Sequence, residues 1–275
     1  MQSTFNMIGF LQNALAEDIG SGDVTSNATI PAERTARFAM NARQPITACG
    51  LIFLPDLFKL ISPQVKVAIK VAEGTRVLAG GTLAVIEGPA RALLAGERTA
   101  LNLVQHLSAV ATLTARYVKE VADTKAKVTD TRKTIPGLRY LQKYAVNVGG
   151  GHNHRMGLYD AILIKDNHIA VAGGVKAAVA AGKATGLTVE VEVDTLAQLH
   201  EALEAGADIV LLDNMDKGML KKAVKMTAGR AKLEASGNVS LDTVRAIAKT
   251  GVDFISVGRL THSAPAVDIG LDWAS

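Results

Sequence analysis

Charged side chains recur at the ends of short apolar segments in the second half of this chain. The segment AKVTD ends in Asp130, AILIK ends in Lys165 and DIVLLD ends in Asp213. Between the first two, a glycine run leads into His154 and Arg155. Arginine and lysine bind phosphates and carboxylates, and carboxylates bind divalent cations. The set therefore predicts a site for a ligand with several anionic groups, together with a metal ion.

Two glutamates lie within a single apolar segment, TVEVEV. Side chains alternate along a strand, so Glu190 and Glu192 point to one side and the valines to the other. A strand covered on both faces would bury both carboxylates, at several kcal/mol each if they were unpaired. We therefore expect them to point inward, into a charged cup. A further segment, KLEAS, contains Glu234 and Ser236.

The elements that must position these residues begin after about Lys125, where short buried segments alternate with alanine-rich helical ones. Six such segments end at intervals of about 20 to 35 residues, which suits parallel βα units. We expect a closed or nearly closed barrel, whose active site lies at the carboxyl ends of the strands. An open doubly wound sheet is the alternative, but no Gly-x-Gly-x-x-Gly stands at a strand-to-helix turn.

The part of the chain before the predicted barrel has a different sequence pattern. Residues 38–87 contain short strand-like segments separated by glycines, which predicts a compact, partly antiparallel β unit. After Pro89, apolar residues such as Leu94, Leu101 and Val104 recur at spacings of three, four or seven, as on one face of a helix. A chain of 275 residues is long enough for two such domains.

Composition and charge exclude several classes of function. The residues are 48% hydrophobic and 20% charged, as in ordinary folded proteins, and the net charge is +4. Basic residues alternate with carboxylates and only 4% of residues are aromatic, so nucleic-acid binding is disfavoured. The most apolar stretch, from Leu51, is interrupted by Pro55, Asp56 and Lys59, and predicts no membrane span. The first 20 residues do not read as a signal peptide, which favours a cytoplasmic protein.

Other kinds of site are weakly supported. Cys49 is the only cysteine, so no internal disulfide or multi-cysteine metal site is possible, and no obvious base stands beside it. His152 and His154 are two residues apart in a glycine-rich loop, which is not a zinc-binding spacing. Ser236 and His262 could belong to a catalytic triad, but nothing indicates a nucleophile elbow.

Several longer segments carry a family resemblance. They are ALAEDIGSGDVTS, GERTALNLVQHLSAVATLT, DTRKTIPGLRYLQKYAV, GGGHNHRMGLYDAILIKDNHI, VEVEVDTL, LLDNM, LEASGNVS and GVDFISVGRLTHS. In this order they resemble the motifs of the quinolinate phosphoribosyltransferases, from about residue 14 to the end. A paralogous family encoded beside molybdenum-transport genes is the nearest alternative, but it usually lacks the asparagine found here as Asn153. A non-catalytic phosphate-binding module with the same cup is the alternative from another class.

The resemblance implies an α/β protein with two domains. Residues 1–109 would form an N-terminal α/β sandwich domain, with 268–275 packing back on it, and 110–267 would form an open βα barrel of about seven strands. The implied activity is that of a pentosyltransferase: transfer of the phosphoribosyl group of phosphoribosyl pyrophosphate (PRPP) to quinolinate, with loss of pyrophosphate and CO2. The product is nicotinate mononucleotide, a precursor of NAD. Homodimers or higher multiples of dimers are expected, with Arg98 completing the site of the neighbouring subunit.

The resemblance also assigns roles to single residues. Quinolinate would be bound by Arg132, His154 and Arg155 with the second subunit's Arg98, and Thr131 belongs to the substrate-binding set. Lys133 and Lys165 would face PRPP, while Glu192 and Asp213 would hold Mg²⁺ and the ribose hydroxyls; these four form the catalytic set. The 5′-phosphate would lie on backbone groups of Ser236, Gly237 and Asn238 and of Val257, Gly258 and Arg259, with His262 nearby.

Two positions depart from the family pattern. The family commonly has a glycine where this chain has Asn238; because asparagine tolerates left-handed backbone conformations better than most residues, we expect the loop to be preserved. A glycine is also usual at the position of Ala109, where the change concerns helix packing more than chemistry.

Overall fold

The computed structural model describes residues 5–274. They divide into two compact units, one formed by the chain up to Leu113 and from Ala264 onward, the other by Thr114–Ser263. The long helix α4 (Ala90–Val121) contributes to both. None of the described helices combines the length and the apolar character that spanning a bilayer requires.

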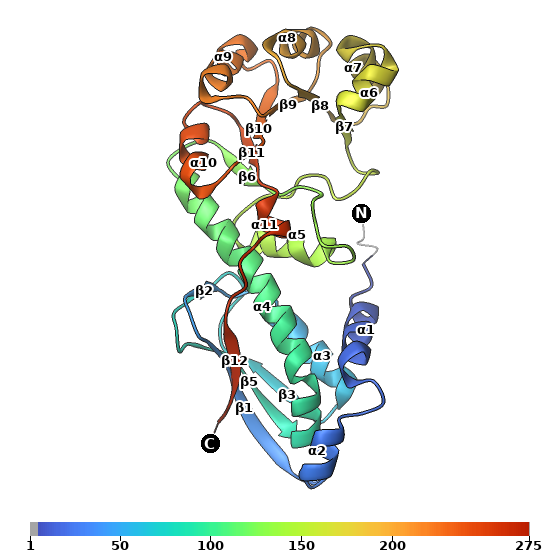
Figure 1. Cartoon of the computed structure of the whole chain (residues 1–275), viewed down its shortest axis with the longest axis vertical. Coiled ribbons are helices and arrows are strands. Elements are labelled where there is room, and N and C mark those ends of the chain that lie inside the picture. Colours follow the sequence, from blue (N-terminus) through green and yellow to red (C-terminus); the bar gives the residue numbers. More distant parts are fainter. Residues whose placement is uncertain (1–4, 275) are drawn as a thin grey trace. The chain divides into compact units, whose positions relative to one another are not determined.

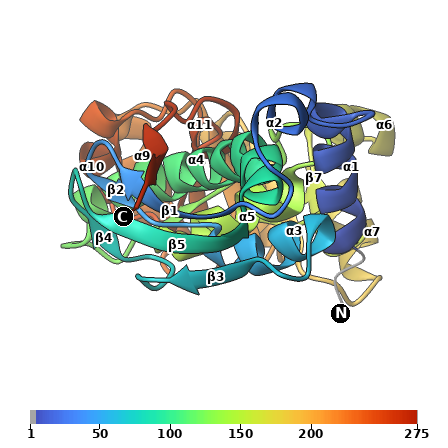
Figure 2. The same ribbon diagram turned by 90° about the horizontal axis from the view of Figure 1, so that it is seen from below.

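The first unit is built on a four-stranded antiparallel sheet in the order β12-β1-β5-β3 (Figures 1 and 2). The described elements of this unit other than α4 are α1 (Met7–Ile19), α2 (Val24–Thr29), β1 (Thr35–Ala42), β2 (Ile46–Thr47), η1 (Leu51–Phe53), α3 (Leu54–Ile61), β3 (Lys66–Ile69), β4 (Arg76–Val77), β5 (Thr82–Pro89) and β12 (Ile269–Trp273). The last strand of the chain therefore returns to pair with the first.

Small residues let the helices of this unit approach closely. A side chain at Gly96 of α4 would lie 2.6 Å from Ile61 and 2.7 Å from Phe58 of α3, so a larger residue there would displace these side chains. Gln105, further along α4, donates a hydrogen bond to the carbonyl of Ile269, 3.2 Å away, at the start of β12.

Cys49 is fully buried in this unit, and burial raises the pKa of its thiol far above the usual range. It is therefore not a nucleophile.

The second unit is a parallel six-stranded sheet in the order β6-β11-β10-β9-β8-β7, flanked by helices (Figure 1). The strands are β6 (Lys127–Thr129), β7 (Ile162–Ile164), β8 (Val189–Val193), β9 (Ile209–Asp213), β10 (Lys232–Ser236) and β11 (Phe254–Ser256). The helices are α5 (Arg139–Val148), α6 (Asp166–Ala172), α7 (Val175–Lys183), α8 (Leu196–Glu204), α9 (Lys217–Thr227), α10 (Leu241–Ala248) and α11 (Arg259–His262). Valine, leucine and isoleucine fill the strands, as expected of a parallel sheet covered by helices.

The βα barrel fold class is confirmed. A parallel bridge between Thr129 and His152 adds one more position beside β6, and in the described chain the sheet is not closed between this bridge and β7. Strands β6 and β7 end one residue earlier than the segments AKVTD and AILIK suggested, because Asp130 and Lys165 already belong to the loop and the helix cap that follow. These residues thus lie at the mouth of the barrel.

Candidate active site

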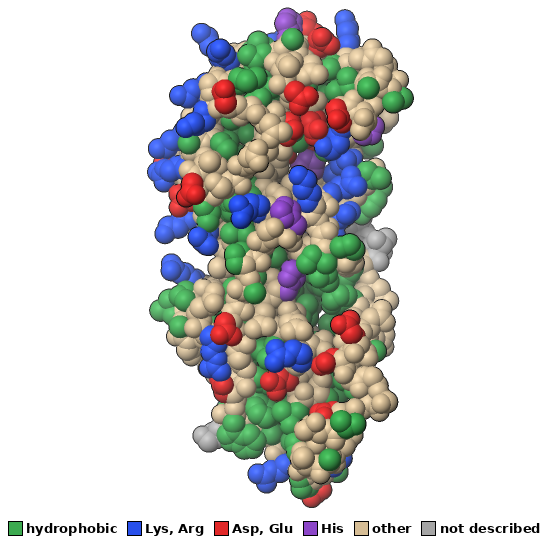
Figure 3. Space-filling view, in the orientation of Figure 1, with side chains coloured by type: hydrophobic (Ala, Val, Ile, Leu, Met, Phe, Trp, Pro, Cys, Tyr) green, Lys and Arg blue, Asp and Glu red, His purple; other side chains and the backbone are tan. Residues whose placement is uncertain are grey.

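A pocket of about 320 Å³ opens at the carboxyl ends of the parallel strands. Parallel strands bring these ends to one edge of the sheet, which is where barrels build their active sites. Figure 3 shows acidic and basic side chains gathered close together on this unit. The lining residues are Thr131, Arg132, Lys133, His154, Arg155, Leu163, Lys165, Glu192, Leu211, Asp213, Glu234, Ser236 and Ser256.

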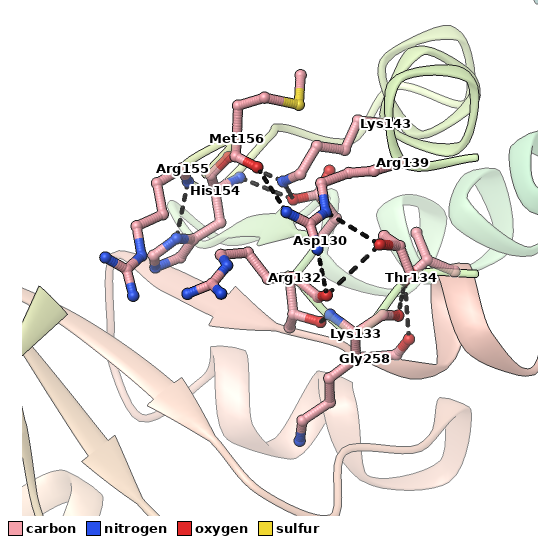
Figure 4. A network of polar contacts seen from close by, with 12 residues as sticks. Asp130, Arg132, Lys133, Thr134, Arg139, Lys143, His154, Arg155, Met156 and Gly258 are labelled. Carbon is pink, nitrogen blue, oxygen red and sulfur yellow. Dashed lines mark hydrogen bonds and ion pairs between the residues drawn. The ribbon is translucent and has the colours of Figure 1, made fainter. Parts of the chain in front are cut away.

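A buried ion pair holds the loop after β6 in place (Figure 4). Asp130 and Lys143 of α5 are both fully buried and form a direct ion pair. Asp130 also accepts the backbone N–H of His154 at 2.9 Å, and the Asn153 amide, oriented to satisfy its neighbours, donates to its other oxygen at 2.8 Å. Lys143 donates in turn to the carbonyl of His154 at 2.9 Å. We call these residues the Asp130 cluster; it fixes the segment that carries His154 and Arg155.

Two arginines reach the pocket from this region (Figure 4). The Nε atoms of Arg132 and Arg155 are buried and have no hydrogen-bond partner among the described residues. Burial and the nearby Arg132 charge lower the pKa of Arg155. Two like charges with unsatisfied donors are unfavourable unless an anion joins them. The pair is thus arranged for a carboxylate or phosphate ligand.

The side chain of His154 belongs to a second buried polar group, together with carboxyl groups of the parallel sheet. Its Nε2 lies 2.9 Å from Glu190 of β8 and 3.8 Å from Glu234 of β10. The backbone N–H of Arg155 donates to its Nδ1 at 2.8 Å. One oxygen each of Glu190 and Glu234 has no hydrogen-bond partner among the described residues. We call His154, Glu190 and Glu234 the Glu234 cluster.

Both nitrogens of His154 are therefore engaged within the protein. This differs from the expectation that His154 binds the substrate's carboxylates directly. In this arrangement the ring contributes to the pocket wall, while the two arginines beside it present the free donors.

At the strand ends on the other side of the pocket, carboxylates and a lysine lie together. Lys165 caps helix α6 and forms an ion pair with Glu192 at the end of β8. Asp213, the last residue of β9, accepts a hydrogen bond from the side chain of Asn214 at 2.7 Å. Glu192 and Asp213 are only partly buried, and both line the pocket. They are the oxygen ligands that Mg²⁺ prefers in proteins.

The loop after β10 has an unusual backbone. Gly237 and Asn238 both have positive φ angles, 93° and 50°, so the asparagine does adopt the left-handed conformation. A side chain at Gly237 would lie 2.1 Å from the Asn214 side chain and 3.0 Å from its backbone nitrogen, so with the positive φ any larger residue would be strained there. Asn238 donates to that same side chain at 3.4 Å.

The remaining predicted residues divide into three groups. Gly258 lies close to the side chains of Lys133 and His262, within 3.2 Å of where its own Cβ would stand, and Arg259 follows it, exposed, at the start of α11. The backbone N–H of Val257 donates to the carbonyl of Thr129 in the neighbouring strand at 2.9 Å, so this group is already occupied, and the prediction for the other backbone groups of this segment stays a prediction. Arg98 is exposed on α4 in the first unit and does not line the pocket.

The structure also adds residues that the sequence left without a role. Glu234 and Ser256 line the pocket, and Lys143 anchors its loop. The alternation of KLEAS could have indicated Glu234, since it lies on the same side of its strand as Ser236. The role of Lys143 could not be predicted from the sequence, because its contact with Asp130 depends on how α5 packs against the sheet.

Models of two families match the chain: "Quinolinate phosphoribosyl transferase, N-terminal domain" over residues 23–108, and the corresponding C-terminal domain over 110–272. A nicotinate-nucleotide pyrophosphorylase [carboxylating] of Mycobacterium leprae is 45% identical over 272 residues, covering 95% of each chain. A probable enzyme of the same name from Bacillus subtilis is 43% identical over 267 residues, covering 95% of this chain and 91% of its own. The structure of the nicotinate-nucleotide pyrophosphorylase from Francisella tularensis matches with a TM-score of 0.95 and 39% identity, covering 99% of this chain and 98% of its own.

Proposed function

We infer, from the fact that this chain belongs to the quinolinate phosphoribosyltransferase family, that it transfers the phosphoribosyl group of PRPP to quinolinate. It releases pyrophosphate and CO2 and yields nicotinate mononucleotide, as a decarboxylating pentosyltransferase of NAD biosynthesis. The substrates are small molecules.

One observation carries this conclusion within the pocket: the unpartnered Nε atoms of Arg132 and Arg155. Guanidinium groups bind carboxylates through paired, charge-assisted hydrogen bonds. Quinolinate has two adjacent carboxylates, which would satisfy both donors and neutralise the two like charges at once. We assign this end of the pocket to the dicarboxylate.

The phosphoribosyl end would then lie at Lys133, Lys165 and the loops after β10 and β11. Breaking the bond between ribose and pyrophosphate develops positive charge on the sugar ring and negative charge on the leaving group. Glu192 and Asp213 would stabilise the sugar, and the two lysines the pyrophosphate. The 5′-phosphate would be bound by the loop of Ser236 to Asn238 and by the residues from Gly258 to His262, without the backbone N–H of Val257.

A magnesium ion is proposed as the cofactor. Mg²⁺ is usually bound by one or two carboxylates together with substrate phosphates, and Glu192 and Asp213 supply such carboxylates at the pocket. When bound, the ion would neutralise charge on the pyrophosphate. The protein's own contribution is to hold the two carboxylates open to the pocket: Lys165 orients Glu192, and Asn214 orients Asp213.

We further propose a homodimer, or a higher multiple of dimers, in which Arg98 completes the site of the neighbouring subunit. Its exposure on α4 supports this, since the side chain is available to a second chain. In a mixture of an Arg98→Ala subunit with a Lys165→Met subunit, mixed dimers would contain one intact site and recover activity. No recovery, with exchange of subunits verified, would contradict the shared site.

A cytoplasmic location stays a prediction. The transfer of its polyanionic substrates through an apolar bilayer is strongly unfavourable, so the protein is expected to share a compartment with them.

The direct test is to incubate the protein with quinolinate, PRPP and Mg²⁺. We expect nicotinate mononucleotide and CO2 in equal amounts. Product formation from nicotinate instead, without CO2, would assign the protein to a different phosphoribosyltransferase reaction.

The two ends of the pocket can be separated by single variants. Arg132→Ala should raise the KM for quinolinate and lower turnover, and Lys133→Ala should lower turnover, by about 10²-fold to 10³-fold for loss of a group that stabilises developing charge. The exposed Lys176→Ala on α7 serves as the control. Near wild-type activity of either pocket variant would refute its role.

A further inference from the structure

The proposed reaction requires a proton that none of the roles above supplies. When CO2 leaves, the electrons of the broken carbon–carbon bond stay on the ring carbon beside the pyridinium nitrogen, and that carbon must then gain a proton. The arginines at the dicarboxylate end cannot give one up, because guanidinium stays protonated in proteins. Lys165 is paired with Glu192, and Lys133 is assigned with it to the pyrophosphate at the other end. An acid is therefore needed close to Arg132 and Arg155.

Glu234 occupies that place. Its side chain is 3% exposed, yet it lines the pocket together with Arg132 and Arg155. It also lines a second cavity of about 160 Å³, toward the amino ends of the strands, which shares His154 and Arg155 with the pocket. Glu190, by contrast, lines the second cavity but not the pocket. Glu234 is thus the one carboxyl of its cluster that faces the substrate.

The position of the imidazole proton of His154 indicates how the Glu234 cluster is protonated. The backbone N–H of Arg155 donates to Nδ1 of His154, so Nδ1 carries no proton and the ring proton is on Nε2. That proton points toward Glu190 and Glu234, 2.9 and 3.8 Å away. A cation bound between these two carboxyl groups would compete with the proton on Nε2. The arrangement therefore favours a proton shared among His154, Glu190 and Glu234.

The charges facing Glu234 favour its protonated form. Burial is the largest effect, and Glu190 on β8 and Asp130 after β6 add negative charge, while His154 and the hydroxyl of Ser256 on β11 oppose them. Together they raise the pKa of Glu234 to about 8. A neutral carboxylic acid in an apolar site is a known way to keep a donor available at neutral pH.

We propose that Glu234 is the acid that protonates the ring carbon from which CO2 has left. The O–H bond of Glu234 breaks, its electrons remain on the carboxylate, and the proton forms the new C–H bond on the ring. The proton on Nε2 of His154 stabilises the carboxylate, and a proton from solvent restores the acid. This inference rests on the proposed function, because it assigns a donor for that reaction.

The test compares Glu234→Gln with wild type, since glutamine keeps the shape but cannot donate the proton as an acid. We expect kcat to fall by about 10²-fold, in the usual range for a general acid, with the KM for quinolinate changed less than about threefold. In a 1:1 mixture of H2O and D2O, the deuterium content at that carbon of the product should also differ between the variant and wild type. The reason is that a different proton donor discriminates differently between hydrogen and deuterium. Glu201→Gln, on the exposed side of α8, is the matched control.

An unchanged deuterium content, or an unchanged kcat, would overturn the inference. If Glu234→Gln does not fold, Ser256→Ala provides a second test: loss of this hydroxyl should shift the high-pH fall in kcat, expected near pH 8, to higher pH. A fall at the wild-type pH would refute the role of Glu234. These outcomes differ from failure of the proposed function, in which the wild-type protein itself forms no nicotinate mononucleotide.

Discussion

Two buried polar clusters lie side by side in the barrel unit, and they are satisfied to different degrees. In the Asp130 cluster, the carboxylate accepts bonds from Lys143, from the His154 backbone and from Asn153. In the Glu234 cluster, two carboxyl oxygens have no hydrogen-bond partner among the described residues. His154 belongs to both, through its backbone in the first and its ring in the second. The clusters therefore differ in what they leave available for a ligand.

The difference separates structural from reactive groups. Burial raises the pKa of Asp130 and lowers the pKa of Lys143, while each charge supports the other. Asp130 and Lys143 bind each other and the backbone of His154, so the pair serves to hold the loop. In the Glu234 cluster the pKa of Glu234 is raised to about 8, with burial as the main cause and Glu190 second. An unsatisfied buried acid is costly to the fold, which is expected where function requires it.

Breaking the satisfied cluster should have the largest effect. Lys143→Met would leave Asp130 as a buried, unpaired charge, and the free energy of unfolding should fall by about 3 to 5 kcal/mol. Denaturant unfolding at pH 7 measures it. The double variant Lys143→Met/Asp130→Asn removes the charge as well and should regain part of the stability. If the double variant is as unstable as the single one, the unpaired charge is not the cause.

The unsatisfied cluster should show the opposite response to substitution. The fold holds Glu234 protonated well above the ordinary pKa of 4.5, so its contribution to stability is full below about pH 4.5 and is lost as the pH rises toward 8. Glu234→Gln does not ionise and escapes this loss. Relative to wild type, the variant should therefore gain about 2 kcal/mol between pH 6 and pH 7.5. A difference in unfolding free energy that does not vary with pH would contradict a raised pKa.

The same two clusters mark how far the sequence could predict this site. Lys165, Glu192 and Asp213 were predictable, because short buried segments reveal parallel strands and their carboxyl ends must meet at one edge. The left-handed Asn238 was predictable from the conformational tolerance of asparagine. These inferences need only local pattern and the geometry of a barrel.

What could not be predicted depends on packing between distant elements. Lys143 lies on a helix, and only the docking of α5 brings it to Asp130. The backbone N–H of Val257 is occupied because β11 pairs with β6, a neighbour set by closure of the sheet. The pKa of Glu234 follows from burial among groups on β8, β11 and the loop after β6. None of these neighbours is adjacent in sequence.

A surface pair on the same unit supplies the smallest expected effect. Lys183 and Asp208 form an ion pair of 2.7 Å, with about 40% of each side chain exposed. This hydrogen bond lowers the pKa of Asp208, but water and salt screen such pairs, which usually contribute 1 kcal/mol or less. Lys183→Met, the same substitution as at Lys143, should therefore lower the unfolding free energy by less than about 1 kcal/mol. The change should shrink further in 1 M salt. If Lys183→Met were as destabilising as Lys143→Met, loss of the ammonium group itself, and not its burial, would explain both, since the two substitutions remove the same group and differ in exposure to solvent.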